Sequence, residues 1–326
     1  MVDKVVIVGV RRGNERLCQS EIQQSIGRAG RSSCHGEAIV ICQDDDIEYA
    51  EHCLSDKPGN ITSRMGCIEE VSFHVLPFMD MCHDELAFSR WFERSFAYEQ
   101  GRYVDFEQVR EYLLSNGCIN EDGNITDFGR ISVCSYFKPD ILKEVEERLI
   151  NLSLEEITDF IPLSFVISPC VQLCHVYADV SDGLDEYCSD VRSFGYVFPD
   201  DEKTRGFNAY CALSKKVLKP IRHAVLQTRK DLGRIFMAMK RIASIHGDTY
   251  RKNRLEIAEY MSKYCAPFEV ASIGVKFGLK LNDAIEMREL KINSMDDLKS
   301  ISPDAILTFS DRLKLALIEK GFLKNS

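Results

Sequence analysis

The sequence predicts a mainly α-helical protein with small β parts, built from several domains. Three observations support this fold class. The chain has 326 residues, which is enough for two or three separate hydrophobic cores. Its two short β-branched apolar runs both lie within the first 42 residues. From residue 63 onward, apolar residues recur mostly with helical spacing, interrupted by turns that contain glycine and asparagine.

The composition favours a globular protein that works inside the cell. Hydrophobic residues make up 45% of the chain and charged residues 28%, and no window reaches the ~18 apolar residues of a membrane span. No basic segment followed by an apolar one opens the sequence. The 13 cysteines are odd in number and irregularly spaced, which favours reduced thiols. We therefore expect a cytoplasmic protein, or one of a nucleoid or of a host-cell cytoplasm if its source is viral, with no membrane partner.

The first predicted domain, residues 1–62, has the pattern of the end of an α/β layer. Residues 4–9 (KVVIVG) and 37–42 (EAIVIC) are typical of strands, a polar, glycine-rich stretch with a short helix separates them, and a helical pattern follows. Asp44–Asp46 come just before that last helix. Acidic residues in this place usually cap a helix and favour its dipole, and a metal site is the alternative. Residues 58–60 (PGN) mark a break.

The second predicted domain, residues 63–138, has the pattern of a winged helix. An amphipathic helix stops at an asparagine-glycine pair, and a short strand follows at 118–119. The turn EDGN leads to a strand at Ile125 and to a helix opened by Thr126 or Asp127. Winged helices serve as structural modules or as nucleic-acid readers, and the fold alone does not decide between these roles.

The third predicted domain, residues 139–262, is helical with one long polar interruption at 181–208. The net charge of −10 argues against a uniformly basic surface, so a nucleic-acid partner would need a local basic patch. Such a patch occurs at 214–254, where many cations face only Asp231 and Asp248. The cations are Lys215, Lys216, Lys219, Arg222, Arg229, Lys230, Arg234, Lys240, Arg241, Arg251, Lys252 and Arg254.

Part of this patch is predicted to bind nucleic acid. Lys230, Arg234 and Arg241 are spaced by four and seven residues and therefore share one face of a helix. With Lys240 they form the candidate phosphate-binding set. Another face of the same helix is apolar and carries Ile235, Met239 and Ile242. A basic face that is merely solvated is the alternative, although clustering in so acidic a protein favours phosphate binding.

The fourth predicted domain, residues 263–326, consists of short helices. An apolar helix, Gly274, a second helix to Leu290 and the segment KINSMDDLKSI resemble a helix-hairpin-helix unit. Such a unit can present backbone amides to a phosphate. Only part of its glycine pattern is present, so a packing role is the alternative.

Residues 24–31 read QSIGRAGR, with two arginines spaced as if to grip a phosphate. The string resembles motif VI of superfamily 2 helicases, whose pattern is Q-x-x-G-R-x-G-R. In such enzymes, arginines reach the γ-phosphate of ATP across the cleft between two domains, where the developing charge requires cations. The resemblance implies that Arg28 and Arg31 are arginine fingers. It also implies that Gln24 orders the site and the attacking water, and that Gly27 belongs to the ATP-binding segment.

The resemblance extends over nearly the whole chain, more strongly before residue 140 than after it. Residues 36–65 look like the end of the second RecA-like domain in the Ski-like branch, which includes the archaeal Hjm-type repair helicases, the HELQ helicases and the helicase half of DNA polymerase theta. In that branch a winged helix, a helical ratchet domain and a small helical hairpin domain follow, which is the order predicted above. Residues 126–130 (TDFGR) are similar to the branch's T-x-F-G-(K/R) turn.

The ratchet helix of this branch places an arginine and, seven residues later, a tryptophan against the translocating single strand. By resemblance, Arg234 stands at the arginine position and Arg241 at the tryptophan position. A guanidinium pairs with phosphate more readily than it stacks on a base, so phosphate contact is implied and base stacking stays open. The single tryptophan, Trp91, lies in the winged-helix region and is expected in the core.

The sequence has no G-x-x-x-x-G-K-(S/T) phosphate loop and no DExH or DExD motif. The resemblance therefore implies that ATP and Mg²⁺ bind at a site completed by another chain, a protein that carries the Walker A and DExH motifs. The two chains would couple ATP hydrolysis to 3′-to-5′ movement on single-stranded DNA, with RNA as the alternative. The partial sheet of residues 1–62 would also need a partner strand, because an unpaired sheet edge is unfavourable.

A second hypothesis keeps the strand binding without the motor. The chain is then a non-enzymatic single-stranded nucleic-acid-binding or regulatory protein derived from a helicase, and GRAGR is only a loop. The two hypotheses differ in one requirement, because only the first needs a partner that carries Walker motifs.

Two cysteine-histidine patterns are weak candidates for other chemistry. Cys170, Cys174 and His175 miss the C-x-x-C-H haem spacing by one residue, and no nearby second pair completes a zinc site. Cys34 and His35 adjoin the motif VI string, but adjacent side chains in a strand or its loop point apart, which argues against a thiol nucleophile with its base. We expect no metal site.

Overall fold

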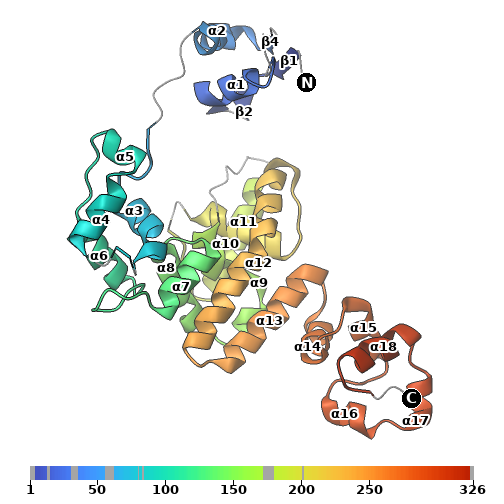
Figure 1. The fold of residues 1–326 in the computed structure, drawn as a ribbon. Coiled ribbons are helices and arrows are strands. Elements are labelled where there is room, and N and C mark those ends of the chain that lie inside the picture. Colours follow the sequence, from blue (N-terminus) through green and yellow to red (C-terminus); the bar gives the residue numbers. More distant parts are fainter. Residues whose placement is uncertain are drawn as a thin grey trace. The chain divides into compact units, whose positions relative to one another are not determined.

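The computed structural model of the chain describes residues 4–12, 15–30, 36–55, 62–79, 81–82, 84–171, 180–199 and 202–323. The chain divides into two compact units, Met1–Ser63 (unit 1) and Arg64–Ser326 (unit 2) (Figure 1). Helices account for 67% of the structure and strands for 5%, so the mainly α-helical class with small β parts is confirmed. The finer division into four named domains stays a prediction. None of the described helices is long and apolar enough to cross a membrane.

Unit 1 is a small α/β layer. Its elements are β1 (Lys4–Val8), β2 (Arg11–Arg12), β3 (Glu15–Arg16), α1 (Gln19–Ile26), β4 (Glu37–Ile41) and α2 (Ile47–Ser55). β1 and β4 pair in parallel, with Lys4 opposite Glu37, and α1 connects them. The predicted order of strand, loop, short helix, strand and helix is confirmed. The sequence does not predict the antiparallel β2–β3 hairpin, because its two-residue strands lack an apolar run.

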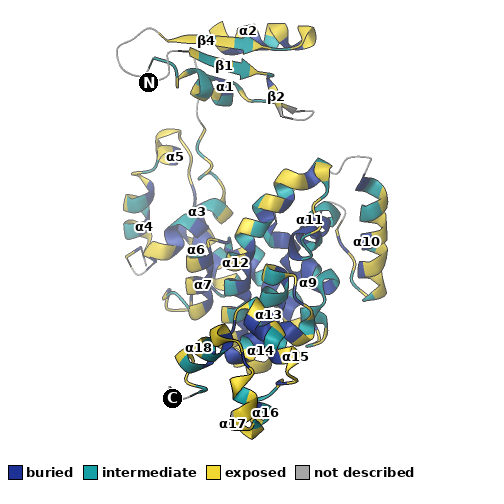
Figure 2. Ribbon diagram, turned by 90° about the vertical axis from the view of Figure 1, so that its right-hand side faces the viewer, coloured by how far each residue is buried: buried dark blue, intermediate teal, exposed yellow. Residues whose placement is uncertain are grey.

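One face of the β1–β4 sheet is packed and the other is open. The buried core of unit 1 consists of Val10, Ile22, Ala50 and Cys53. Alternate strand residues, such as Ile7 and Val40, pack against this core. The intervening side chains are exposed: Val6 (53%), Val8 (80%), Ile39 (41%) and Ile41 (54%). The exposed residues of β4 are yellow in Figure 2. The described part of unit 1 thus leaves four β-branched side chains uncovered on one sheet face.

Unit 2 begins with short helices and one isolated antiparallel β-bridge. The helices are α3 (Ile68–Val75), α4 (Glu85–Phe92), α5 (Phe96–Glu99), α6 (Phe106–Ser115) and α7 (Asp127–Ser135). Trp91 of α4 packs against the hydrophobic core, as predicted. The predicted strands are reduced to one antiparallel bridge between Ile119 and Ile125. The predicted positions of α6 and α7 are confirmed, and the winged-helix assignment itself stays a prediction.

The TDFGR segment follows this bridge and begins α7. Oγ1 of Thr126 accepts a hydrogen bond from the amide of Gly129 at 3.0 Å and donates one to the carbonyl of Gly117 at 2.6 Å. Thr126 is therefore the N-cap of α7. A Cβ at Gly129 would lie 2.2 Å from the carbonyl oxygen of Cys118. Only glycine permits this close approach, which gives the glycine of the segment a physical role.

Longer helices form the middle of unit 2. They are α8 (Pro139–Asn151), α9 (Phe160–Ile167), α10 (Ser181–Ser193), α11 (Lys203–Leu213), α12 (Arg222–Ile245) and α13 (Thr249–Tyr264). The predicted polar interruption at 181–208 is wrong, because α10 and part of α11 lie within it. α10 packs through Leu184, Tyr187, Cys188 and Val191, which recur at helical spacing. Its many acidic and serine residues obscure that spacing in the sequence.

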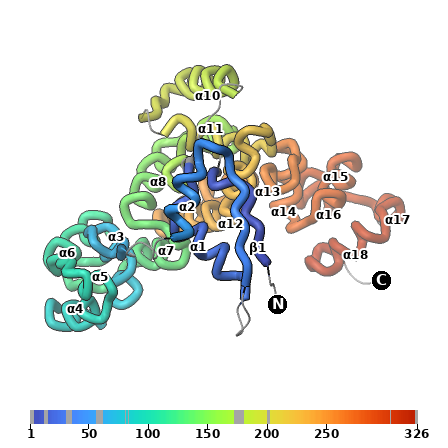
Figure 3. The backbone as a smooth tube through the Cα atoms, turned by 90° about the horizontal axis from the view of Figure 1, so that it is seen from above, coloured from blue at the N-terminus to red at the C-terminus, as the bar shows by residue number. Residues whose placement is uncertain are grey.

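The C-terminal helices form a hydrophobic core of their own. They are α14 (Phe268–Phe277), α15 (Leu281–Glu289), α16 (Met295–Ser300), α17 (Pro303–Leu307) and α18 (Asp311–Glu319). Val270, Phe277, Met287 and Leu313 are among the buried side chains of this core. Within unit 2, these helices lie at the end opposite α3–α6, as Figures 1 and 3 show.

Gly274 lies inside α14 and not between two helices as predicted. A Cβ at this position would lie 2.4 Å from the ring of Tyr260, so glycine here lets α13 pack closely on α14. The break falls instead at Gly278, whose φ of +64° is in the left-handed region that favours glycine.

Candidate arginine-finger site and nucleic-acid interface

The predicted arginine-finger segment follows α1 in unit 1. Gln24 is exposed on the last turn of α1, Gly27 ends the helix, and Arg28 is exposed in the turn that follows. The amide of Gly27 donates to the carbonyl of Gln23 at 2.8 Å, which closes the helix end. The structure thus places Gln24, Gly27 and Arg28 at one exposed end of α1. Arg31 lies outside the described residues.

Arg28 meets the first requirement of an arginine finger, an available guanidinium. Its side chain forms no hydrogen bond or ion pair with the residues that the structure describes. A planar guanidinium that is not already paired can bind a phosphate oxygen through two N–H groups. No group of three or more His, Cys, Asp or Glu side chains able to hold a metal ion occurs among the described residues. The described part of unit 1 thus offers one available guanidinium, that of Arg28, beside the exposed end of α1.

Asp46 does not cap a helix as predicted. It is 2% exposed, and its carboxylate accepts hydrogen bonds from Arg11 at 2.6 and 2.7 Å and from Arg16 at 3.0 Å. The hydrogen bond from Arg11 holds the pKa of Asp46 below its usual range, against the effect of desolvation. This pairing ties the β2–β3 hairpin to the start of α2. A metal site at Asp44–Asp46 would need the carboxylate of Asp46, which is already paired with Arg11 and Arg16.

Helix α12 carries three of the four predicted nucleic-acid-binding residues, Lys230, Arg234 and Arg241, on one side. Its apolar face is confirmed, since Ile235, Met239 and Ile242 are all buried. Lys230 and Arg241 are exposed and form no ion pair with described residues. Two of the four predicted phosphate ligands are therefore available in unit 2.

Arg234 lies on the same face but is held by protein groups. Its Nη1 donates to the carbonyl of Tyr136 at 3.3 Å, and its Nη2 donates to Asp231 at 3.2 Å. The guanidinium also lies 4.4 Å from the centre of the Phe137 ring. These contacts join α12 to the end of α7, so Arg234 braces two helices. A phosphate contact by Arg234 stays a prediction, and such a contact would compete with this brace.

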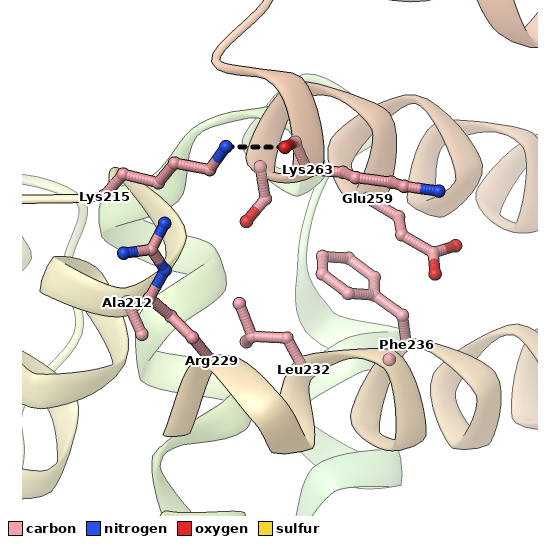
Figure 4. A pocket seen from close by; sticks show the side chains of 9 residues that line it. Ala212, Lys215, Arg229, Leu232, Phe236, Glu259 and Lys263 are labelled. Carbon is pink, nitrogen blue, oxygen red and sulfur yellow. Dashed lines mark hydrogen bonds between the residues drawn. The ribbon is translucent and has the colours of Figure 1, made fainter. Parts of the chain in front are cut away.

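Lys240 lies on another side of α12, which faces α13. Its Nζ lies 2.6 Å from the carboxylate of Glu259. The same side of α12 lines a pocket of about 430 Å³ that α11, α12 and α13 enclose (Figure 4). Its lining residues are Ala212, Lys215, Arg229, Leu232, Gly233, Phe236, Glu259, Ser262 and Lys263.

The pocket carries a positive excess. Lys215 and Arg229 both line the pocket, and Figure 4 draws them at the same side of it. Nζ of Lys215 donates to the carbonyl of Lys263 at 2.5 Å, while the guanidinium of Arg229 has no partner among the described residues. Glu259 is the single acidic residue of the lining, and its charge is already paired with Lys240. The arrangement is suited to an anion.

The sequence indicates this second basic side of α12 only by spacing. Arg222, Arg229 and Phe236 recur every seven residues and therefore share a helix face. The neighbouring Lys230 and Arg234 obscure that periodicity. The pocket also needs α11 and α13, whose contributions do not follow from the sequence of α12.

The cysteine-histidine patterns gain no structural support. Cys34, His35, Cys174 and His175 lie outside the described residues, and no disulfide forms among the cysteines that are described. Desolvation raises the pKa of the Cys170 thiol to about 12, which makes this side chain a poor nucleophile.

Comparison of the chain with models of known protein families gave no match, and comparison with curated proteins gave none either.

Proposed function

We propose that the chain is the C-terminal portion of an ATP-dependent 3′-to-5′ nucleic-acid helicase that works with a protein carrying the Walker A and DExH motifs. One observation carries this proposal: unit 1 combines an exposed arginine turn with a parallel sheet that is open on one face. Parallel sheets are normally covered on both faces. The strands β1 and β4 pair only with each other in the described part of unit 1. A partner that adds strands and covers Val6, Val8, Ile39 and Ile41 would complete the layer.

The chain would supply cations to the partner's ATP site. Bound ATP and Mg²⁺ supply the transferable phosphoryl group and its counter-charge. Arg28 and Arg31 would stabilise the negative charge that develops on the γ-phosphate oxygens in the transition state. Gln24, exposed one turn before Arg28, would orient the attacking water through its side-chain amide.

Unit 2 would hold the single strand. Lys230 and Arg241 supply free cationic groups on the outer face of α12, and such groups bind backbone phosphates without sequence preference. We propose single-stranded DNA as the ligand, and binding of RNA is the outcome to be compared with it.

The test is ATPase activity of the full chain mixed with each phosphate-loop protein encoded by a neighbouring gene, with and without oligothymidylate. We expect activity only in a mixture, stimulated by the strand. Arg28→Ala or Arg31→Ala should lower turnover about 10³-fold while the complex still forms, because an arginine finger acts mainly on the transition state. Val8→Asp with Ile41→Asp should instead prevent complex formation. Lys299→Ala, an exposed charge change in α16, is the control.

One result would favour the second hypothesis over the motor. If the chain binds oligothymidylate but no phosphate-loop protein restores ATPase activity, it is a non-enzymatic strand-binding or regulatory protein. The free cations of α12 suffice for that role, and the arginine turn of unit 1 then has no catalytic part.

A further inference from the structure

We propose that the pocket between α11, α12 and α13 binds a backbone phosphate of single-stranded nucleic acid, as a second strand contact distinct from the outer face of α12. The identity of the ligand as a strand rests on the proposed function. The evidence for an anion site in this pocket is that Arg229 and Lys215 both line it.

The lining of the pocket contains cationic groups whose charge no described acidic side chain neutralises. Arg229 has no partner among the described residues, and it lies at the same side of the pocket as Lys215 (Figure 4). Lys215 uses one N–H in its bond to the carbonyl of Lys263, so two donors of its ammonium remain. Glu259, the acid of the lining, is paired with Lys240. A phosphate oxygen between Arg229 and Lys215 would satisfy both cations.

The backbone at Lys215 supports a role for its side chain. Lys215 follows Ser214, the C-cap of α11, and has a φ of +57° in the left-handed region. Glycine or asparagine is the usual residue at such a position, because a Cβ is disfavoured there. A lysine at this position costs stability and brings an ammonium group to the pocket.

The surroundings of the pocket suit a polyanion better than a single small anion. Arg222 lies seven residues before Arg229 on the same face of α12 and is exposed, about 10 Å along the helix axis. Lys216 and Lys219 are also exposed in the segment that leads from α11 to α12. These exposed cations are close in sequence to the residues that line the pocket, and a polyanion can pair with several of them at once.

The experiment measures binding of fluorescein-labelled oligothymidylate to the full chain by anisotropy over a range of salt concentrations, without ATP. Arg229→Gln and Lys215→Gly should each weaken binding about tenfold, and each should reduce the slope of log affinity against log salt by about 0.7, as loss of one phosphate contact predicts. Lys215→Gly should also raise the unfolding temperature, since it relieves the left-handed lysine. If Lys215 had only a structural role, Lys215→Gly would not weaken binding while raising the unfolding temperature.

Two further variants control for charge and for shape. Lys291→Gly makes the same replacement at another lysine in the left-handed region, with a φ of +59° and outside the pocket, and should leave the affinity unchanged. Gly233→Leu removes no charge, and a Cβ at Gly233 meets nothing within 4 Å, so its side chain would fill space at the pocket. It should weaken strand binding and leave the fold intact.

Three results would overturn the proposal. Equal losses with Lys215→Gly and Lys291→Gly would show general electrostatic attraction without a site. Unchanged affinity with both Arg229→Gln and Gly233→Leu would remove the pocket from the strand path. If these variants lose affinity for thymidine monophosphate or inorganic phosphate but keep their affinity for the oligonucleotide, the pocket serves a free phosphate compound instead.

Failure of the pocket and failure of the motor have different signatures. The anisotropy measurement needs neither ATP nor a partner. Absence of ATPase activity with pocket-dependent strand binding would refute the motor alone. ATPase activity in a mixture that pocket variants do not change would refute the pocket alone.

Discussion

Units 1 and 2 differ in how completely they bury their apolar side chains. In unit 2, α3–α13 share one continuous core, and α14–α18 share another with Ile257 of α13, so its helices have apolar partners within the unit. In unit 1, four buried residues lie on one side of the sheet and four exposed β-branched residues lie on the other. The difference is that unit 2 buries its apolar side chains by itself, whereas the described part of unit 1 leaves one sheet face exposed. In the proposed function, unit 2 alone would bind the strand, and Arg28 would act only in the ATP site of a partner.

The largest effect is expected where unit 2 is most tightly packed. Gly129→Ala would place a methyl group 2.2 Å from the carbonyl oxygen of Cys118, a backbone atom that cannot move freely. We expect a loss of about 3 kcal/mol in the free energy of unfolding, measured by denaturant titration. Gly183→Ala in α10 is the control, because its Cβ would lie an ordinary 3.5 Å from Phe207. An equal response of both variants would show that unit 2 is loosely packed.

A matched pair of valine substitutions compares the two units directly. Val109→Thr in α6 places a hydroxyl at a fully buried position and should cost about 2 kcal/mol. Val8→Thr in β1 changes a side chain that is already exposed and should cost less than about 0.5 kcal/mol. Hydrogen exchange of peptides from each unit measures the two effects separately. A large cost at Val8 would mean that its sheet face is covered within this chain.

Acid should weaken unit 1 through Asp46. The pKa of this carboxyl is lowered in the folded state, mainly by Arg11, so its pairing stabilises unit 1 above the ordinary aspartate pKa of about 3.9. That stabilisation is lost as the pH falls through the lower folded value. Asp46→Asn should therefore reduce exchange protection of unit 1 peptides at pH 7, and the difference from the parent should shrink in acid. A difference that is constant with pH would contradict the charged pairing.

The smallest effects are expected for arginine variants that test which unit binds the strand. Arg241→Gln should weaken binding of oligothymidylate about fivefold, because an exposed arginine contributes one screened phosphate contact. Arg28→Ala in unit 1 should leave this affinity unchanged. Arg234→Gln should weaken binding only together with a lower unfolding temperature, since this side chain braces α12 against Tyr136 and Phe137. Anisotropy and thermal unfolding of the same samples provide the two readouts.

Local signals made much of the fold predictable. The β-branched runs of β1 and β4 and the cap at Thr126 each depend on residues that are close in sequence. The sequence does not predict helix α10, because acidic and serine residues outnumber its apolar ones. It predicts a break at Gly274, although this glycine lies inside α14 and leaves room for the ring of Tyr260 from another helix.

The sequence predicts those parts of the candidate sites whose residues all lie on one helix or strand. The exposed cations of α12 follow from helical spacing alone. The pairing of Asp46 with Arg11 joins residues 35 apart, and the bond between Lys215 and Lys263 joins residues 48 apart. Such contacts depend on the packing of separate elements, which periodicity does not specify.

The exposed sheet face of unit 1 also affects how prone the unassembled chain is to aggregate. Exposed β-branched side chains beside unpaired strand edges are the features that chaperones bind and that lead to aggregation when a partner is lacking. If the proposed partner covers Val8 and Ile41, the cellular amount of this chain should follow the amount of that partner.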